Sequence, residues 1–340
     1  MIKDLNNNLF GIFTLAHIIL ISCVLLIIFF KEKISSYLKI IDYPDGKLKI
    51  HQVPTPRLGG LILFIYLLPA LILNYIIYNE GYKNLIITII ILVIFFFVGL
   101  IDDRKPLSAI RKSLILIVTL FITIPISKHL IINHIYFKNL NFSINLEQAA
   151  IFFTIFSIFA LYNAFNFSDG INGIATSLGI FWIIFIIIKS GNYLNFYYQS
   201  ILICLLFILY FNIKKKLFLG NSGSSLYVII ISLILIQEYK NNNIYCDEIF
   251  LILFFPGMDM IRLTFQRVYD GHSPSAGDTK HIHHLMCNLI KKEYIFLVYA
   301  TITVIPILIY NFFIQNFYIV FTFSLIKYFL IFFLLTKLKK

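Results

Sequence analysis

Charged residues are scarce in this chain. Lys, Arg, Asp and Glu make up 13% of its 340 residues and hydrophobic residues make up 60%, whereas soluble globular domains carry about 25% charged residues. These proportions exclude a water-facing surface over the whole chain, and they also exclude intrinsic disorder. Cysteine is scarce as well. The four cysteines show no paired spacing, so the sequence predicts neither a disulfide framework nor a zinc site.

Long apolar runs without a charged residue recur from one end of the chain to the other, which excludes a soluble enzyme held by a single anchor. A bilayer core of about 30 Å needs about 20 apolar residues per helix. The segment 246–262 is the most interrupted candidate, because it contains Asp247, Glu248 and Asp259. We expect an all-α polytopic membrane protein with eleven transmembrane helices, near residues 9–30, 60–79, 85–101, 109–127, 149–163, 172–188, 197–213, 219–237, 246–262, 294–311 and 317–336.

The distribution of basic residues predicts the orientation of these helices across the membrane. Loops on one side of the expected membrane hold 21 Lys and Arg residues, and loops on the other side hold 6. Basic loops stay in the cytoplasm, so we expect a periplasmic N-terminus and a cytoplasmic C-terminus in the bacterial inner (plasma) membrane. The net charge of +12 then reflects loops beside anionic membrane lipid, with no nucleic-acid partner. In the external segment 128–148, two short apolar runs around residues 138–141 predict a small β-hairpin.

Five polar clusters lie between the expected spans, and all five fall on the cytoplasmic side. This gathering at one membrane face indicates chemistry there. In the first cluster, residues 42–60, prolines and glycines fix a loop to which Lys49, His51 and Arg57 add cationic donors. The simpler alternative for this cluster is an ordinary positively charged cytoplasmic loop.

The second cluster places Asp102 and Asp103 side by side where a span ends. Carboxylates near a membrane are costly unless a cation or a metal offsets their charge. Their closeness suits a general base or a metal site, and Lys112 follows as a candidate partner. The alternative is an interfacial stop signal paired with Arg104.

The third and fourth clusters contain no Lys or Arg. On a helix, Asn163, Asn166 and Asp169 stand at positions i, i+3 and i+6 and aim three oxygen-bearing side chains at one region, which suits Mg²⁺. The alternative is a polar contact between helices. The fourth cluster, residues 219–225, is a Gly/Ser turn that opens a helix and offers backbone N–H groups to a phosphate. Small residues at that place more often serve helix packing.

The fifth cluster, residues 256–284, is rich in cations and histidine. Three clustered histidines can bind a transition metal, and His281 and His284 are expected to share a helix face. Because no Cys or close Glu accompanies them, we favour contact with a phosphate or substrate. The candidate residues are Arg262, Arg267, Lys280, His281, His283 and His284.

Together the five clusters resemble those of the polyprenyl-phosphate N-acetylhexosamine-1-phosphate transferase family (glycosyltransferase family 4), in family order and spacing from about Asp42 to His284. The Pro-Thr-Pro-Arg-Leu-Gly-Gly and His-Ile-His-His strings look like the branch that starts O-antigen, enterobacterial common antigen and teichoic acid synthesis, and unlike the MurNAc-pentapeptide branch. The resemblance implies one integral-membrane transferase domain, 1–340, that works on the cytoplasmic face. Its reaction would move N-acetylhexosamine-1-phosphate from a UDP-N-acetylhexosamine to undecaprenyl phosphate, with Mg²⁺ or Mn²⁺, and release UMP.

The resemblance also implies residue roles. Asp102 matches the catalytic carboxylate, and Asp103 supports it. The metal and nucleotide residues are matched by Asn163, Asn166, Asp169, Asn172 and Asn221. The diphosphate loop is matched by Arg262, Arg267, Lys280, His281, His283 and His284. The groups that hold the lipid phosphate or the aspartates are matched by Lys49, His51, Arg57 and Lys112.

Position 221 departs from the family pattern, because Asn221 stands where relatives usually have an Asp that binds Mg²⁺. An amide oxygen still coordinates, but with one negative charge less. A catalytically impaired relative is therefore one alternative, and a lipid-linked sugar transporter or flippase is another. The sequence leaves open which N-acetyl sugar is used, which pathway is served and whether the protein forms a homodimer.

Overall fold

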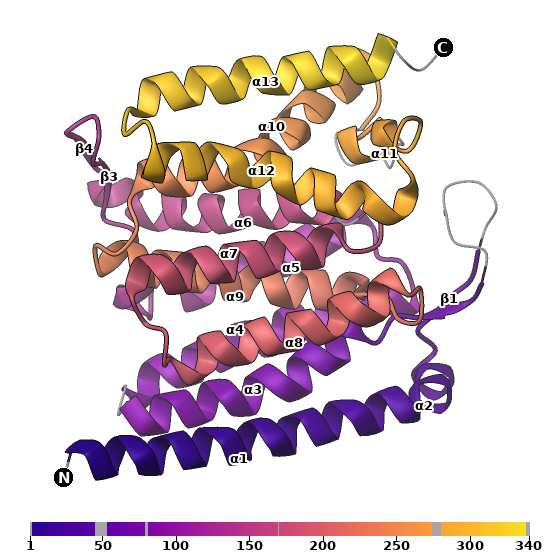
Figure 1. Cartoon of the computed structure of the whole chain (residues 1–340), viewed down its shortest axis with the longest axis vertical. Coiled ribbons are helices and arrows are strands. Elements are labelled where there is room, and N and C mark those ends of the chain that lie inside the picture. The colour runs from indigo at the N-terminus through magenta and orange to yellow at the C-terminus, as the bar shows by residue number, and fades with distance from the viewer. Residues whose placement is uncertain (1, 45–52, 79–80, 169, 274–279, 338–340) are drawn as a thin grey trace.

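The computed structural model describes residues 2–44, 53–78, 81–168, 170–273 and 280–337. Helices dominate it; they lie side by side in one bundle, stacked along its longest axis and running across that axis (Figure 1). The all-α prediction is confirmed. The helices are α1 (Ile2–Phe29), α2 (Lys31–Leu38), α3 (Gly59–Tyr78), α4 (Tyr82–Arg104), α5 (Ala109–Thr123), α6 (Ala150–Ser168), α7 (Ile174–Ser190), α8 (Phe196–Ile213), α9 (Gly220–Lys240), α10 (Cys246–Tyr269), α11 (Ile282–Met286), α12 (Ile295–Phe312) and α13 (Phe317–Lys337).

Eight helices in the described part of the chain are long and apolar enough to cross a membrane: α1, α3, α4, α6, α8, α9, α12 and α13. The prediction of a multi-pass membrane protein is therefore confirmed. The three other expected spans coincide with α5, α7 and α10. Of these, α5 has 15 residues and α7 has 17, and α10 contains several charged residues.

The short strands lie at opposite ends of the bundle. The hairpin predicted within residues 128–148 is present, with β3 (His134–Phe137) antiparallel to β4 (Phe142–Asn145). At the other end, β1 (Ile41–Asp42) pairs with β2 (Thr55–Pro56), which sequence patterning did not predict. Figure 1 shows α11 at the same end as β1, far from the hairpin.

Helix α9 forms the centre of the bundle, and 83% of its apolar window is buried. Its first turn is held by glycines of neighbouring helices. A Cβ atom on Gly60 of α3 would come within 2.2 Å of Ser222 Oγ, and one on Gly99 of α4 would come within 2.5 Å of the Asn221 carbonyl oxygen. These helices approach so closely only because glycine stands at both contacts. The packing alternative for residues 219–225 is the one observed.

Two acidic residues near the start of α10 have partners within the protein, which explains why this charged segment still forms a buried helix. Asp247 is fully buried and accepts hydrogen bonds from the backbone N–H groups of Lys138 (2.9 Å) and Asn139 (2.8 Å) in the hairpin. Glu248 forms an ion pair with Lys189 at the end of α7. Their negative charges are thus offset at the hairpin end of the bundle.

Candidate active site

Asp102 and Lys112 form a buried ion pair where α4 ends and α5 begins. Lys112 Nζ donates to Asp102 Oδ2 at 2.9 Å, and the backbone N–H of Leu107 donates to Asp102 Oδ1 at 2.7 Å. Each residue of the pair is only 8% exposed. A partly desolvated carboxylate needs such donors to remain charged. Of the two partners that the resemblance implies for Lys112, the lipid phosphate or the aspartates, the structure shows a contact with Asp102. Arg104 contacts the Leu38 carbonyl oxygen instead.

Asp103 caps the N-terminus of α9. Its carboxylate accepts hydrogen bonds from the N–H groups of Asn221 (2.8 Å) and Ser222 (2.9 Å) and from Ser222 Oγ (2.7 Å). The first N–H groups of a helix have no partner within the helix, and the helix dipole favours a negative charge there. Two of the N–H groups expected to hold a phosphate are therefore bonded to this side chain.

Arg57 connects the first cluster to the aspartates. Its guanidinium pairs with Asp42 of β1 and lies 3.7 Å from Asp103 Oδ1. The β1–β2 pairing brings residues 41–42 and 55–56 together, which places Arg57, directly after β2, beside the end of α4. Lys49 and His51 lie outside the described residues.

The end of α6 carries the amides of the third cluster. Tyr162 contacts Ser225 of α9 at 3.2 Å, and Lys112 Nζ lies 5.7 Å from the centre of the Tyr162 ring. These contacts place Tyr162, which directly precedes Asn163, between the first turns of α9 and Lys112. The amide nitrogen of Asn163 donates to the Phe159 carbonyl oxygen at 2.9 Å, an orientation that leaves its amide oxygen available for a ligand.

The three histidines gather around the turn after α6. His281 is the N-cap residue of α11, so the expected shared helix face of His281 and His284 is replaced by a cluster of all three rings. The ring centres are 5.1 Å apart for His281 and His283, and 4.5 Å apart for His283 and His284. A Cβ atom on Gly170 would come within 2.4 Å of His283 Nε2. This contact joins the third and fifth clusters.

His283 is fully buried, and neither of its ring nitrogens has a hydrogen-bond partner among the described residues. Burial, reinforced by the neighbouring imidazoles of His284 and His281, lowers the pKa of His283 well below its usual range. The ring is therefore neutral at neutral pH.

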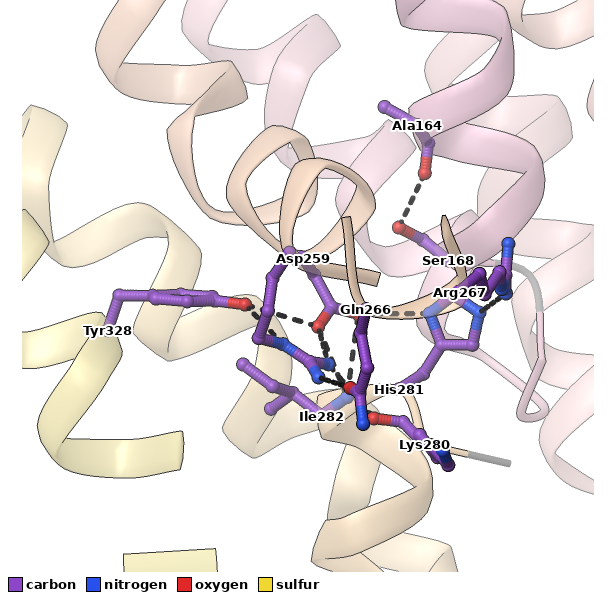
Figure 2. A network of polar contacts seen from close by, with 10 residues as sticks. Ala164, Ser168, Asp259, Gln266, Arg267, Lys280, His281, Ile282 and Tyr328 are labelled. Atoms are coloured by element: carbon purple, nitrogen blue, oxygen red, sulfur yellow. Dashed lines mark hydrogen bonds and ion pairs between the residues drawn. The ribbon is translucent and has the colours of Figure 1, made fainter. Parts of the chain in front are cut away.

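Asp259 organises the histidine loop from α10. His281 Nδ1 lies 3.0 Å from Asp259 Oδ2, and Arg262 donates to Asp259 Oδ1 at 2.7 Å. Tyr328 of α13 and His281 lie on opposite sides of Asp259 (Figure 2). The sequence pattern assigned Asp259 no role, although a carboxylate inside an expected span, three residues before an arginine, points to a buried ion pair.

A transition-metal site is one geometric alternative here, because possible ligand atoms of Asp259, His281 and His283 lie within 4.8 Å of one another. Arg262 already neutralises the Asp259 carboxylate, and the Arg267 guanidinium lies 3.5 Å from His281 Nε2. Two guanidinium groups this close oppose a bound cation, so the charge arrangement disfavours a metal at this position.

Oxygen-bearing side chains at the ends of α4, α6 and α9 fit Mg²⁺ better, because hard cations prefer carboxylate and amide oxygens. Asn163, Asn221 and Asp102 offer such atoms. Asn166 and Asn172 are half-buried on either side of the turn after α6, and Asp169 lies outside the described residues.

The remaining candidates of the fifth cluster have specific partners. Lys280 Nζ pairs with the exposed Asp270 at 2.9 Å. Arg267 lies over the Phe167 ring, 4.9 Å from its centre, at the end of α6. The Arg262 guanidinium bonds to Tyr328, Gln266, Asp259 and the Lys280 carbonyl oxygen, which makes Arg262 an anchor of the loop.

Comparisons with known proteins show what this chain is similar to. Residues 85–238 match the family model described as Glycosyl transferase family 4, a range that includes Asp102, Asn163 and Asn221. The chain is 26% identical over 292 residues to a decaprenyl-phosphate N-acetylglucosaminephosphotransferase of Mycobacterium tuberculosis, covering 75% of this chain and 71% of the relative.

A second relative comes from another group of bacteria. The chain is 24% identical over 284 residues to an undecaprenyl-phosphate alpha-N-acetylglucosaminyl 1-phosphate transferase of Escherichia coli O157:H7, covering 77% of this chain and 72% of the relative. The resemblance predicted from the five polar clusters is therefore confirmed: this chain is similar to polyprenyl-phosphate N-acetylglucosamine-phosphate transferases.

Proposed function

We propose that this protein transfers N-acetylhexosamine-1-phosphate from a UDP-N-acetylhexosamine to undecaprenyl phosphate and releases UMP, as the first membrane step of O-antigen, teichoic acid or related polysaccharide synthesis. One observation carries this proposal. Clusters that are far apart in the sequence meet through direct contacts, which are Arg57–Asp103, Asp103–Asn221, Tyr162–Ser225 and Gly170–His283. Carboxylates, amides and cations thus surround one region, as a reaction between two phosphates requires.

The chemistry is a phosphoryl transfer. An oxygen of the lipid phosphate forms a bond to the β-phosphorus of the nucleotide sugar, and the bond from that phosphorus to the oxygen bridging the two phosphates breaks, so UMP leaves. Asp102 is placed to take the proton of the lipid phosphate, while Lys112 and Arg57 attract its negative charge. Asp103 holds the start of α9 in place.

Mg²⁺ is the cofactor that fits this proposal, with Mn²⁺ as a substitute, and Asn163, Asp169 and Asn221 are its proposed ligands. When bound, the ion would neutralise charge on the diphosphate of the donor. The available amide oxygen of Asn163 supports this assignment.

An apolar groove supplies a place for the lipid tail. It has a volume of about 510 Å³ and is lined by α6, α9, α10 and the external hairpin. Residues from Phe137 in β3 to Ile261 in α10 line it, so it runs from the external end of the bundle to the residue before Arg262. A polyprenyl chain in this groove would present its phosphate near the polar end of the bundle.

For the membrane arrangement we propose all eleven spans, with the active site at the cytoplasmic face of the bacterial inner membrane. The 21 to 6 bias of basic residues supports this orientation. Lys105→Cys and Lys215→Cys should be protected from an impermeant external thiol reagent in intact cells, whereas Tyr82→Cys and Asn242→Cys should react. Labelling of Lys215→Cys in intact cells would overturn the orientation.

Purified protein in undecaprenyl-phosphate liposomes tests the function. UMP release is measured with UDP-linked GlcNAc, GalNAc, QuiNAc and FucNAc. We expect UMP with one or two of these sugars, only when the lipid phosphate and a divalent cation are both present. A flippase would move a preformed lipid-linked sugar and release no UMP, and this result would overturn the proposal.

A further inference from the structure

Asp259 lies beside the polar end of the bundle without belonging to the residues matched to catalysis. It is 3% exposed on α10, and its carboxylate faces the loop before α11 (Figure 2). We propose that Asp259 is a positioning residue. It fixes the tautomer and the orientation of His281, so that Nε2 of His281 faces the diphosphate of the nucleotide-sugar donor. This inference rests on the proposed function.

The hydrogen bonds define which nitrogen of His281 faces which partner. Nδ1 lies 3.0 Å from Asp259 Oδ2, and a carboxylate only accepts hydrogen bonds, so Nδ1 carries the proton. Nε2 is then the nitrogen on the far side of the ring, 3.5 Å from the Arg267 guanidinium. The same ring lies 5.7 Å from the Phe167 ring at the end of α6. Nε2 therefore faces the third cluster.

The backbone around His281 is held by the same pair of charged residues. Arg262 donates to the Lys280 carbonyl oxygen at 2.9 Å, and the Ile282 N–H lies 3.4 Å from both Asp259 oxygens. Asp259 and Arg262 therefore hold the residues before and after His281 as well as its ring. Tyr328 adds a third anchor, since its hydroxyl accepts from Arg262 Nε at 2.9 Å.

Arg262 and Asp259 neutralise one another, so the anchor adds no net charge to the site. Arg267 and His281 present the nitrogen atoms that face α6. A neutral imidazole accepts a hydrogen bond from Arg267 through Nε2, and a protonated one donates to a phosphate oxygen. Without Asp259 the imidazole could rotate or change tautomer, and its nitrogen would no longer be aimed at the donor.

Kinetics of Asp259→Asn, His281→Ala and the double variant test whether Asp259 acts through His281. We expect each single variant to raise KM for the UDP-sugar about tenfold or more, the size of one charge-assisted hydrogen bond, and to leave KM for undecaprenyl phosphate unchanged. The double variant should be no worse than His281→Ala alone, because both changes remove one interaction. Additive losses, or equal changes in both KM values, would overturn the proposal.

A matched control separates this effect from the loss of any buried acid. Asp247→Asn removes a fully buried carboxylate from the other end of the same helix. We expect it to lower the thermal stability and to leave both KM values of the folded enzyme unchanged. Asp259→Glu should restore part of the UDP-sugar affinity lost in Asp259→Asn, because it returns the charge. A change of KM in Asp247→Asn as large as that in Asp259→Asn would count against a specific role.

A spectroscopic test requires neither enzymatic activity nor a variant of Asp259 that still folds. Solid-state NMR of ¹⁵N-histidine-labelled wild-type protein in liposomes, compared with His281→Gln, identifies the His281 signals. We expect a proton on Nδ1, and a proton on Nε2 alone would overturn the proposal. If wild type releases no UMP while Nδ1 is protonated, the proposed function fails and the Asp259–His281 arrangement stands.

Discussion

The backbone N–H of Asn221 donates a 2.8 Å hydrogen bond to the carboxylate of Asp103. This bond joins the end of α4 to the start of α9, and it does not depend on the side chain at position 221. Replacement of the family's usual Asp by Asn therefore leaves the junction of the two helices intact. At the proposed Mg²⁺ site, the substitution would reduce the negative charge offered to the ion.

Asn221→Asp should lower the Mg²⁺ requirement. A carboxylate adds one negative charge to the proposed metal site, and a gain of about 1.4 kcal/mol already means a tenfold higher affinity. We expect the half-saturating Mg²⁺ concentration to fall about tenfold or more in UMP-release assays, while Asp169→Asn abolishes activity. An unchanged Mg²⁺ dependence in Asn221→Asp would show that position 221 does not bind the metal.

The two adjacent aspartates should respond differently to removal of their charge. Asp102→Asn is expected to lower turnover by about 100-fold or more, the range for a positioned acid or base, while the protein still inserts into the membrane. Asp103→Asn places an amide N–H₂ against the N–H donors of Asn221 and Ser222, so we expect a lower melting temperature. Measurements of turnover and of thermal unfolding on both purified variants test this prediction. Near-normal UMP release by Asp102→Asn would show that Asp102 has no catalytic role.

Gly60→Ala should destabilise the bundle. The new Cβ atom would lie 2.4 Å from the backbone nitrogen of Gly223, and backbone atoms cannot move aside without shifting α9. Overpacking of this kind costs about 1–3 kcal/mol. Gly11→Ala in α1 is the matched control, because a Cβ there meets nothing within 4 Å. Melting temperatures in detergent should fall for Gly60→Ala only, and equal values for both variants would contradict the packing at this contact.

Acid should weaken the fold partly through His283. Its pKa is lowered in the folded protein by burial, so below the ordinary value of about 6.5 the unfolded chain takes up a proton that the folded chain refuses. The contribution to stability is therefore complete above pH 6.5 and is lost as the pH falls. His283→Asn should flatten the decline in melting temperature between about pH 7 and pH 5. An identical decline in both proteins would place the acid sensitivity elsewhere.

Much of the fold follows from hydropathy. Each of the eleven expected spans coincides with a helix, because an apolar run of that length leaves its backbone no other partner in a bilayer. The hairpin around residues 138–141 followed from two short apolar runs. The β1–β2 pair and the extension of α10 to Tyr269 did not. The first depends on a contact across a long loop, and the second carries no apolar periodicity.

The sequence predicted which residues make up the candidate site better than it predicted which of them contact one another. The family resemblance left Lys112 beside either the lipid phosphate or the aspartates, and the structure pairs it with Asp102. That Asp103 would cap α9 depends on how closely Gly99 lets α4 approach Ser222, which is a distance between helices that no local pattern encodes. For the same reason the sequence did not assign Asp259 to the histidine loop.

The most direct test of the central claim follows the β-phosphate of the donor. Protein in undecaprenyl-phosphate liposomes is given UDP-GlcNAc labelled with ³²P at the β-phosphate and with ³H in the sugar, or the equivalent UDP-sugar that supports UMP release. Transfer of a sugar phosphate predicts both labels in the lipid extract in equal amounts, with UMP as the nucleotide product and transfer by Asp102→Asn lower by about 100-fold or more. Sugar label in the lipid without ³²P, accompanied by UDP, would contradict the account.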